Sequence, residues 1–378
     1  MKKILSQHLF NVILKSTVSF LPFVTFLFLS GETEVAFNTF SYHFAVFNIL
    51  FGFFGLPLYQ YFMVTGERSN LKKIYTTNSV SIQVFLALSI CISSVLYIVG
   101  FSVAVIIPSA LVYSYIIGLT AFRTRRGYIK YEMAVNFAFF LVLLLGLIFF
   151  GYGSSVGFLF ATISLAIFGT LLFPARDLEL VNPTTSTAGE KLEIGKYVAV
   201  SSLGSLVSYG DILIAVQFLP ASDAYIYIWV NRALLGGSIL CLGLNNYLMA
   251  KKETFDSRST IAIFMAISIF IGVIACLAAY VALEIILKVN APLVIYLLMF
   301  TLIIVKYISV IPSVFMMHAK LQTQRILSTL YAGVFYLATA YTLISYSRLT
   351  LLTLTLAVLS YHSVLLMRNV YSIAKNYS

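Results

Sequence analysis

Long apolar segments fill most of this chain, and short polar stretches separate them. Each segment holds about 20 residues or more, which is the length that an α-helix needs to cross the hydrocarbon core of a bilayer. The pattern predicts twelve membrane-spanning helices, at residues 8–29, 36–64, 75–99, 101–122, 129–150, 154–173, 196–218, 222–250, 259–286, 291–317, 326–346 and 349–368. Segments 36–64 and 222–250 exceed the length that a bilayer requires, so we expect them to tilt or to protrude.

A long polar run lies near the midpoint of the chain, from Pro174 to Glu193. Its prolines, its glycine and its mixed charges cannot continue a membrane helix, because they break helical hydrogen bonds or need water. We therefore expect a cytoplasmic linker at 175–195. It would join an N-terminal lobe at 1–174 to a C-terminal lobe at 196–378.

The two halves of the chain resemble each other weakly. A shift of 188 residues lays Phe37 on Tyr225 and Tyr59 on Tyr247, and it brings the apolar segments and their gaps into register. Internal repeats of this kind build many secondary transporters. The predicted fold is an all-α integral membrane protein with about 12 transmembrane helices in two six-helix lobes.

Composition agrees with this fold class. Hydrophobic residues make up 61% of the chain and charged residues 10%, whereas soluble domains carry roughly 25% charged residues. The three cysteines lie inside apolar segments, without the spacing of a metal site or of a disulfide framework. Lys2 and Lys3 precede an apolar run that lacks a clear cleavage site, so we expect a retained first helix rather than a signal peptide.

Lysine and arginine are distributed unequally over the predicted loops. With a cytoplasmic N-terminus, 19 of the 24 belong to cytoplasmic segments, 2 to outside loops and 3 to the interior of spans. This asymmetry follows the positive-inside rule, and it predicts a multi-pass protein with both termini in the cytoplasm. The net charge of +11 then reflects topology and contact with anionic headgroups, so nucleic acid is not an expected partner.

Three cations lie inside predicted spans, namely Lys15, Arg232 and Lys306. A charge at the centre of a bilayer costs roughly 2.5 to 3.5 kcal/mol on insertion scales unless it faces protein or water. Each cation shares a helical face with polar or small residues, as Lys306 does with Ser309 and Ser313, and such faces point toward a bundle interior or a water-filled cavity. We expect these cations to bind substrate, with structural ion pairing as the alternative.

Asp211 is the acid that lies deepest in a predicted span, on a polar stripe that includes Ser205 and Ser208. It could neutralise Arg232 on the next helix, and the sequence favours this pairing. It could instead accept a proton or help to bind a coupling cation. Three cations against one deep acid leave an excess positive field, for which an anionic passenger is the simplest use.

His43 is a second candidate for coupling or pairing. The repeat puts it within one residue of the position that matches Arg232. A histidine inside a membrane span either satisfies local hydrogen bonds or relays protons, and the sequence leaves both roles open.

Catalytic patterns are missing from the sequence. It has no Gly-rich phosphate loop, no His, Cys or Asp cluster with metal-ligand spacing, and no long outside loop that could hold an acceptor site. We therefore expect that the protein is not an enzyme and has no metal or cofactor.

Three stretches carry a resemblance to a known family: SFLPFVTFLFLSGETEVAF at 19–37, FGFFGLPLYQYFM at 51–63, and SSLGSLVSYGDILIAVQFLPASDAYIYIWVNRALLGGS at 201–238. They are similar to bacterial polysaccharide-unit exporters of the O-antigen flippase type. That family belongs to the multidrug/oligosaccharidyl-lipid/polysaccharide exporter superfamily. The resemblance implies two six-helix lobes in an inverted V around a central cavity.

The same resemblance matches Asp211 to a family aspartate, and Tyr225 and Arg232 to an aromatic-then-basic pattern. It implies a flippase of the bacterial inner membrane that translocates an undecaprenyl-diphosphate-linked oligosaccharide, an O-antigen or capsule repeat unit, by alternating access. Arg232, Lys15 and Lys306 would hold the diphosphate. Membrane lipids, H+ or Na+ as coupling ion, and the polysaccharide polymerase machinery are the other expected partners.

Two alternatives stay open. One is a drug or organic-ion exporter of the same superfamily, although that branch often has an acid deep in the first lobe and this chain has none there. The other is a membrane enzyme of polysaccharide assembly.

Overall fold

The computed structural model describes residues 33–65, 88–125 with gaps at 89, 93, 96–97 and 101, 129–151, 155–172, 188–232, and 258–377 with gaps at 287, 290, 320 and 347. Lys15, the segment predicted at 8–29 and the first part of the predicted linker lie outside the described residues.

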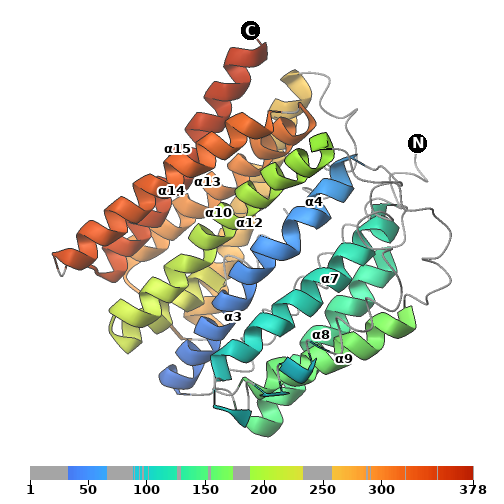
Figure 1. Cartoon of the computed structure of the whole chain (residues 1–378). Coiled ribbons are helices and arrows are strands. Elements are labelled where there is room, and N and C mark those ends of the chain that lie inside the picture. The colour runs from blue at the N-terminus through green and yellow to red at the C-terminus, as the bar shows by residue number, and fades with distance from the viewer. Residues whose placement is uncertain are drawn as a thin grey trace. The chain divides into compact units, whose positions relative to one another are not determined.

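The described residues form helices, and no strand occurs among them, which confirms the all-α prediction for this part of the chain. The labelled elements (Figure 1) are α3 (Glu34–Phe54), α4 (Leu56–Thr65), η2 (Ser102–Val105), α7 (Ile106–Arg125), α8 (Ile129–Phe150), α9 (Val156–Leu172), α10 (Ala188–Phe218), α12 (Arg258–Val281), the π-helix η5 (Ala282–Ile286), α13 (Leu293–His318), α14 (Gln322–Ser345) and α15 (Leu351–Tyr377). A further helix covers 221–232.

Four described helices are long and apolar enough to cross a membrane: 195–218 in α10, 293–317 in α13, 322–345 in α14 and 351–375 in α15. Shorter apolar helices lie at 106–117, 134–150, 156–167 and 265–274. The chain is a multi-pass membrane protein. The count of twelve spans stays a prediction.

The segment predicted as one helix at 36–64 is divided in the structure. α3 ends at Phe54, Gly55 forms a turn, and α4 begins at Leu56. Pro57 has no N–H to donate, so the helical hydrogen-bond ladder cannot continue unbroken through this point. Hydrogen bonds from Gly55 N to Phe51 O (2.8 Å) and from Tyr59 N to Gly55 O (3.0 Å) bridge the break.

The described residues separate into two compact units, and both boundaries fall inside helices. Unit 1 contains the described residues up to Tyr42 and those from Leu206 onward, and unit 2 contains 43–205. α3 and α10 therefore contribute to both units. The six-helix lobes at 1–174 and 196–378 stay a prediction.

Unit 2 is built on α7, α8 and α9, which lie side by side (Figure 1). Aromatic rings fill its core, where Phe47 of α3 contacts Tyr113, Phe139 and Phe158 at centroid distances between 5.1 and 5.7 Å. Such ring pairs stabilise a core beyond the area that they bury.

Glycines allow two close helix contacts in unit 2. A Cβ on Gly146 of α8 would lie 2.6 Å from the Cα of Gly157 in α9, and a Cβ on Gly52 of α3 would lie 1.9 Å from Ser205 Oγ in α10. Membrane helices lack a hydrophobic drive to associate, so small residues that let their backbones approach are a main source of packing energy.

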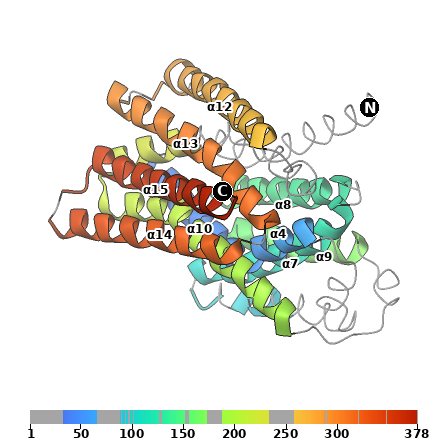
Figure 2. The same cartoon turned by 90° about the horizontal axis from the view of Figure 1, so that it is seen from above.

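In unit 1, α15 packs against both α13 and α14, and α12 packs against α13 (Figure 2). The first turns of α3 pack on the helix at 221–232. Phe37 stacks on Trp229 with ring centroids 5.0 Å apart, and it meets Tyr225 edge-on at 5.0 Å. The Asn38 side chain donates a hydrogen bond to Ala221 O at 3.1 Å. This bond holds the start of α3 beside the start of the helix at 221–232.

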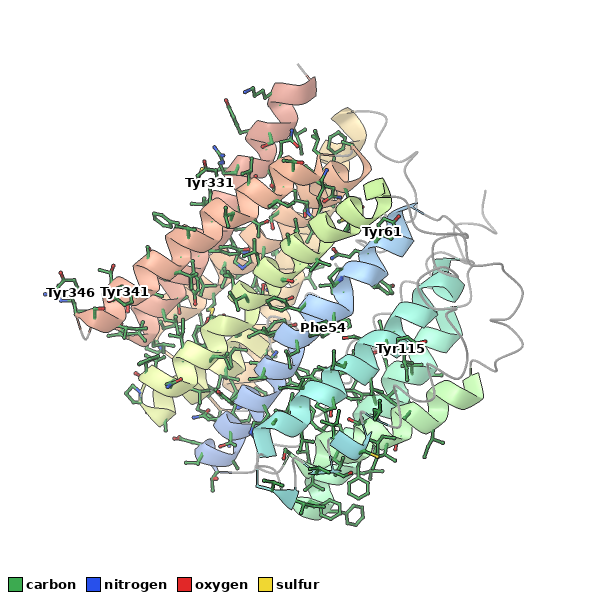
Figure 3. All side chains as sticks on the ribbon, viewed as in Figure 1. Phe54, Tyr61, Tyr115, Tyr331, Tyr341 and Tyr346 are labelled. Atoms are coloured by element: carbon green, nitrogen blue, oxygen red, sulfur yellow. The ribbon has the colours of Figure 1, made fainter. Side chains whose placement is uncertain are left out.

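Two exposed tyrosines mark the C-terminal end of α14. Tyr341 and Tyr346, at the end of α14 (Figure 3), are 73% and 74% exposed. Tyrosines of this kind are enriched where a helix leaves the bilayer, because their rings prefer the headgroup level.

Candidate functional site

The candidate site is a buried polar cluster in unit 1, centred on the Asp211 carboxylate of α10. Three neutral groups donate hydrogen bonds to it: the Ile212 backbone N–H to Oδ1 at 2.8 Å, and the Tyr227 hydroxyl and the Asn231 amide to Oδ2 at 2.5 and 3.0 Å. Asp211 is only 2% exposed. Hydrogen bonds of this kind stabilise the charged form of a carboxylate, so they offset part of the cost of burying Asp211.

A tight turn brings these residues to the same depth. α10 ends at Phe218, and Pro220 precedes the next helix, whose first backbone bond runs from Ala224 N to Pro220 O at 2.9 Å. The two helices therefore run in opposite directions from a common end. Tyr227 and Asn231 are four residues apart on one face of the second helix, so both side chains reach Asp211.

Two predicted cations belong to this cluster. The charges of Arg232 and Lys306 both act on the Asp211 carboxylate. Arg232 is 4% exposed, and its guanidinium carbon lies 5.9 Å from the centroid of the Tyr209 ring, within the range of a cation–π contact.

Lys306, on α13, is half-buried. Within the described part of the chain, its ammonium makes no hydrogen bond and no ion pair. It nevertheless lies in the electrostatic range of Asp211, Arg232 and His362. An ammonium in this position carries charge that a ligand can use.

α14 and α15 supply the other side of the cluster. Tyr336 of α14 lies in the electrostatic range of Asp211, and its ring meets Tyr361 of α15 at 6.3 Å. His362 follows Tyr361 and is buried beside its ring at 4.9 Å. The cluster therefore draws on α10, the helix at 221–232, α13, α14 and α15.

The structure buries one further cation that the sequence had assigned to a cytoplasmic segment. Arg325, in the first turns of α14, is 6% exposed, and its Nε donates to Ser313 Oγ of α13 at 3.0 Å. Ser313 lies two helical turns beyond Lys306 on the same face of α13, as the sequence stripe predicted.

The predicted site residues thus divide into three groups. Asp211, Arg232 and Lys306 come together in unit 1. His43 is buried in α3 and belongs to unit 2. Lys15 lies outside the described residues.

Sequence reasoning missed Tyr227, Asn231 and Tyr336. Tyrosines count as apolar in a hydropathy pattern. Asn231 directly precedes Arg232, and the sequence argument considered only the charged residue of this pair. A usable signal existed for α14, where Gln322, Arg325, Thr329 and Tyr336 follow the helical period and are all buried.

This arrangement of two cations, one carboxylate and buried hydroxyl groups can hold an anion or carry a proton. Among the described residues, no group of three His, Cys, Asp or Glu side chains could hold a metal ion. Two cations near one carboxylate give the cluster an excess of positive charge.

Solved structures provide the matches that the comparisons found for this chain. Comparisons with protein-family models and with curated sequences found no match. A mutant of the Vibrio cholerae MATE transporter VcmN matches 99% of this chain over 97% of its own, with 13% identity and a TM-score of 0.63. An outward-facing multidrug resistance MATE family transporter of the MOP superfamily matches 98% of this chain over 94% of its own, with 13% identity and a TM-score of 0.61.

A MOP superfamily transporter from Pyrococcus furiosus matches 99% of this chain over 95% of its own, with 15% identity and a TM-score of 0.59. The chain has the fold of these transporters. The likeness extends over nearly the full length of both chains, so it includes both units.

Proposed function

We propose that this protein is a membrane transporter that flips an undecaprenyl-diphosphate-linked oligosaccharide across the bacterial inner membrane by alternating access. Arg232, Lys306 and Lys15 bind the diphosphate, and the sugars pass through the polar interior while the polyprenyl tail stays in lipid. The protein catalyses no bond formation, and H+ or Na+ drives the cycle.

The Lys306 ammonium is the observation that carries this proposal. It is half-buried, lies in the field of Asp211 and Arg232, and makes no described hydrogen bond or ion pair. Because a cation in a poorly hydrated setting attracts an anion more strongly than one in water, a substrate with two phosphate charges fits here. The hydrogen bonds that Asp211 accepts come from neutral donors. The Asp211 carboxylate therefore does not neutralise the Lys306 ammonium by direct contact.

Export of drugs or organic ions is the second candidate function. The comparisons favour it, because one similar structure is a multidrug resistance MATE family transporter. A transporter of organic cations would, however, gain nothing from buried Arg232 and Lys306. The Pyrococcus furiosus transporter, described as having a binding pocket of reversed polarity that suggests a different function, supports the idea that pocket charge follows substrate in this fold.

Flipping in proteoliposomes tests the proposal. A fluorescent polyprenyl-diphosphate disaccharide is the substrate, and an impermeant quencher reports the fraction in the outer leaflet. We expect Lys306→Gln to slow flipping by roughly tenfold or more, which corresponds to the loss of a charge-assisted hydrogen bond. Arg232→Gln should act in the same direction. Arg232→Lys should keep part of the rate if a point charge suffices, and fail if the diphosphate is gripped bidentately.

The matched control is Arg368→Gln, which removes the same charge from an exposed position on α15, over the ring of Tyr331. It should flip the lipid at the parental rate. Uptake of a cationic dye is measured in the same vesicles. Dye transport without lipid flipping would replace the proposal by the drug-exporter function, and parental flipping by folded Lys306→Gln protein would remove Lys306 from the binding site.

A further inference from the structure

An apolar cavity lies in unit 1, away from the polar cluster. It occupies about 140 Å³ between α12, the π-helix η5, α13 and the helix at 221–232. Its walls include Val230, Leu277, Leu283, Tyr296 and Leu297, and nearly all of its surface comes from apolar atoms. A dry cavity of roughly 150 Å³ with such walls can take up a hydrocarbon the size of benzene, so this one has room for a segment of a hydrocarbon chain.

Local backbone structure keeps the cavity open. α12 changes into five residues of π-helix at Ala282–Ile286, a rare widening that is common at functional sites. Tyr296 crosses from α13 to the chain that follows the π-helix, where its hydroxyl donates to Val289 O at 3.0 Å. Its ring also meets Tyr280 edge-on at 5.2 Å, so the ends of the two helices are fixed with the cavity between them.

The cavity opens at the surface of the protein, where Leu277 and Leu297 of its wall are each 59% exposed. Both lie in helices whose apolar character fits a bilayer. In a bilayer, lipid tails would surround this opening. Water would find almost no polar partner inside the cavity, whereas an acyl chain would lose nothing on entering it.

A cation follows the π-helix in the chain and has an uncommon backbone conformation. Lys288 has φ of 53°, and it is the one described non-glycine residue with positive φ. The next residue, Val289, donates a backbone hydrogen bond to the carbonyl oxygen of Leu283 at 2.9 Å, and Leu283 is part of the cavity wall. The backbone next to Lys288 is therefore fixed close to the cavity. Glycine or asparagine would adopt this positive φ at a lower energetic cost than lysine does. A lysine at a strained position therefore suggests a functional role for its side chain.

Lys288 is also exceptional in the charge pattern. It is one of only two cations in the loops predicted to lie outside, whereas 19 belong to cytoplasmic segments. Among the described residues it makes no ion pair, and the nearby Glu284 interacts with the Tyr296 hydroxyl instead. An exposed lysine whose backbone is fixed close to an apolar cavity, at a helix end, suits a lipid that has a phosphate at the membrane surface and a chain below it.

We propose that this cavity binds one glycerophospholipid of the membrane leaflet at this end of α12 and α13, with its phosphate on Lys288 and one acyl chain between α12 and α13. The site is separate from the transported substrate. The bound lipid fastens α12 to α13 and to the helix at 221–232, which carries Arg232.

Titration of the delipidated full-length protein with phosphatidylglycerol that carries a brominated acyl chain tests the site. Trp229 is the only tryptophan in the chain, and it precedes Val230 in the cavity wall. A bound brominated chain should quench its fluorescence in a saturable manner, and native mass spectrometry should count one retained phospholipid. Lys288→Asn should weaken binding roughly fivefold through loss of the phosphate contact. Leu297→Phe, which fills the cavity mouth, should abolish the saturable quenching.

Two features of the design guard against misfolding and misassignment. Lys288→Gly relieves the backbone strain, so it should keep or raise the unfolding temperature of the delipidated protein while it loses the lipid. Arg348→Gln, at the other cation of the outside loops, should bind as the parental protein does. Binding that survives both Lys288→Gly and Leu297→Phe would overturn the site, and so would displacement of the phospholipid by an equimolar polyprenyl diphosphate, which would make it a substrate site. Neither result depends on whether the protein flips an oligosaccharide.

Discussion

Asp211 and Arg232 interact through space rather than through a described hydrogen bond. The carboxylate takes its described hydrogen bonds from Ile212, Tyr227 and Asn231, while the guanidinium charge acts on it from the adjoining helix turn. Each neutral donor holds the carboxylate in position, and the cations offset the cost of burying its charge. Removing one of the two charges therefore leaves the other buried without a compensating charge, which destabilises the fold.

A double-mutant cycle measures this coupling. Asp211→Asn and Arg232→Gln should each lower the amount of folded protein in the membrane, since breaking a buried charge pair costs as much as about 3 to 5 kcal/mol. The double variant should recover part of the loss. Folded protein is quantified by fluorescence-detected size exclusion, and strictly additive losses would show that the two charges do not stabilise each other.

At this scale the sequence predicted charges better than their partners. Asp211, Arg232 and Lys306 stood out because an ionisable residue in an apolar segment is expensive. Tyr227 and Tyr336 did not, because the tyrosine ring fits an apolar pattern while its hydroxyl serves a polar site. Arg325 was assigned to the cytoplasmic surface because it comes near the start of its segment, and only its contact with Ser313 shows that it points into unit 1.

Among the elements, α3 shows how one small residue permits close packing. Gly52 faces α10 so closely that an added Cβ would lie 1.9 Å from Ser205 Oγ and 2.2 Å from Ser205 Cβ. Beyond the break at Gly55, α4 also contacts α10: Ser201 donates to Gln60 at 3.0 Å, and the rings of Tyr61 and Tyr197 meet at 5.7 Å. The hydrogen bond and the ring contact depend on the approach that Gly52 allows.

Gly52→Ala should therefore destabilise unit 2 by about 1 to 3 kcal/mol through overpacking. Adding Ser205→Gly removes the opposing side chain and should restore most of the stability. Gly204→Ala is the control on α10, because a Cβ there meets nothing within 4 Å and should leave stability unchanged or slightly raised. Thermal unfolding of the purified protein reports all three, and equal effects at Gly52 and Gly204 would contradict the close contact.

Helix ends were harder to predict than helices. Apolar runs marked α8 at 129–150 without error, but α10 begins at Ala188, before the apolar part of its span, and α15 continues to Tyr377. These extensions are polar turns that stay helical because the backbone bonds of the buried part propagate into them. Hydropathy predicts which residues lie within the bilayer. It does not predict helix ends, because a helix can continue into the water beyond the membrane.

For the whole molecule, the length pattern of the apolar segments was enough to predict an all-α membrane protein. The similar structures share only 12–15% identity with the chain, yet they match nearly all of it. A lipid-exposed helix needs apolar side chains of almost any kind, so identity can fall while segment lengths persist. What substrate the fold carries depends on a few buried residues that the length pattern does not encode.

The predicted topology can be checked directly by cysteine labelling of a cysteine-free background. An impermeant maleimide applied from outside should label Ser222→Cys and Arg348→Cys, and should miss Lys72→Cys and Thr184→Cys until the membrane is opened. The expectation rests on the 19 to 2 distribution of lysine and arginine. Outside labelling of Thr184→Cys in intact cells would contradict the twelve-span arrangement.

The contact between Phe37 and Tyr225 has a meaning for descent as well as for packing. The predicted repeat makes these two residues equivalent, and their rings meet with centroids 5.0 Å apart. In a pair of identical chains related by a two-fold axis, a residue touches its own copy only beside that axis. An ancestor made of two unfused six-helix chains would thus have needed, at this one place, a side chain that packs well against itself, and an aromatic ring meets that demand edge-on.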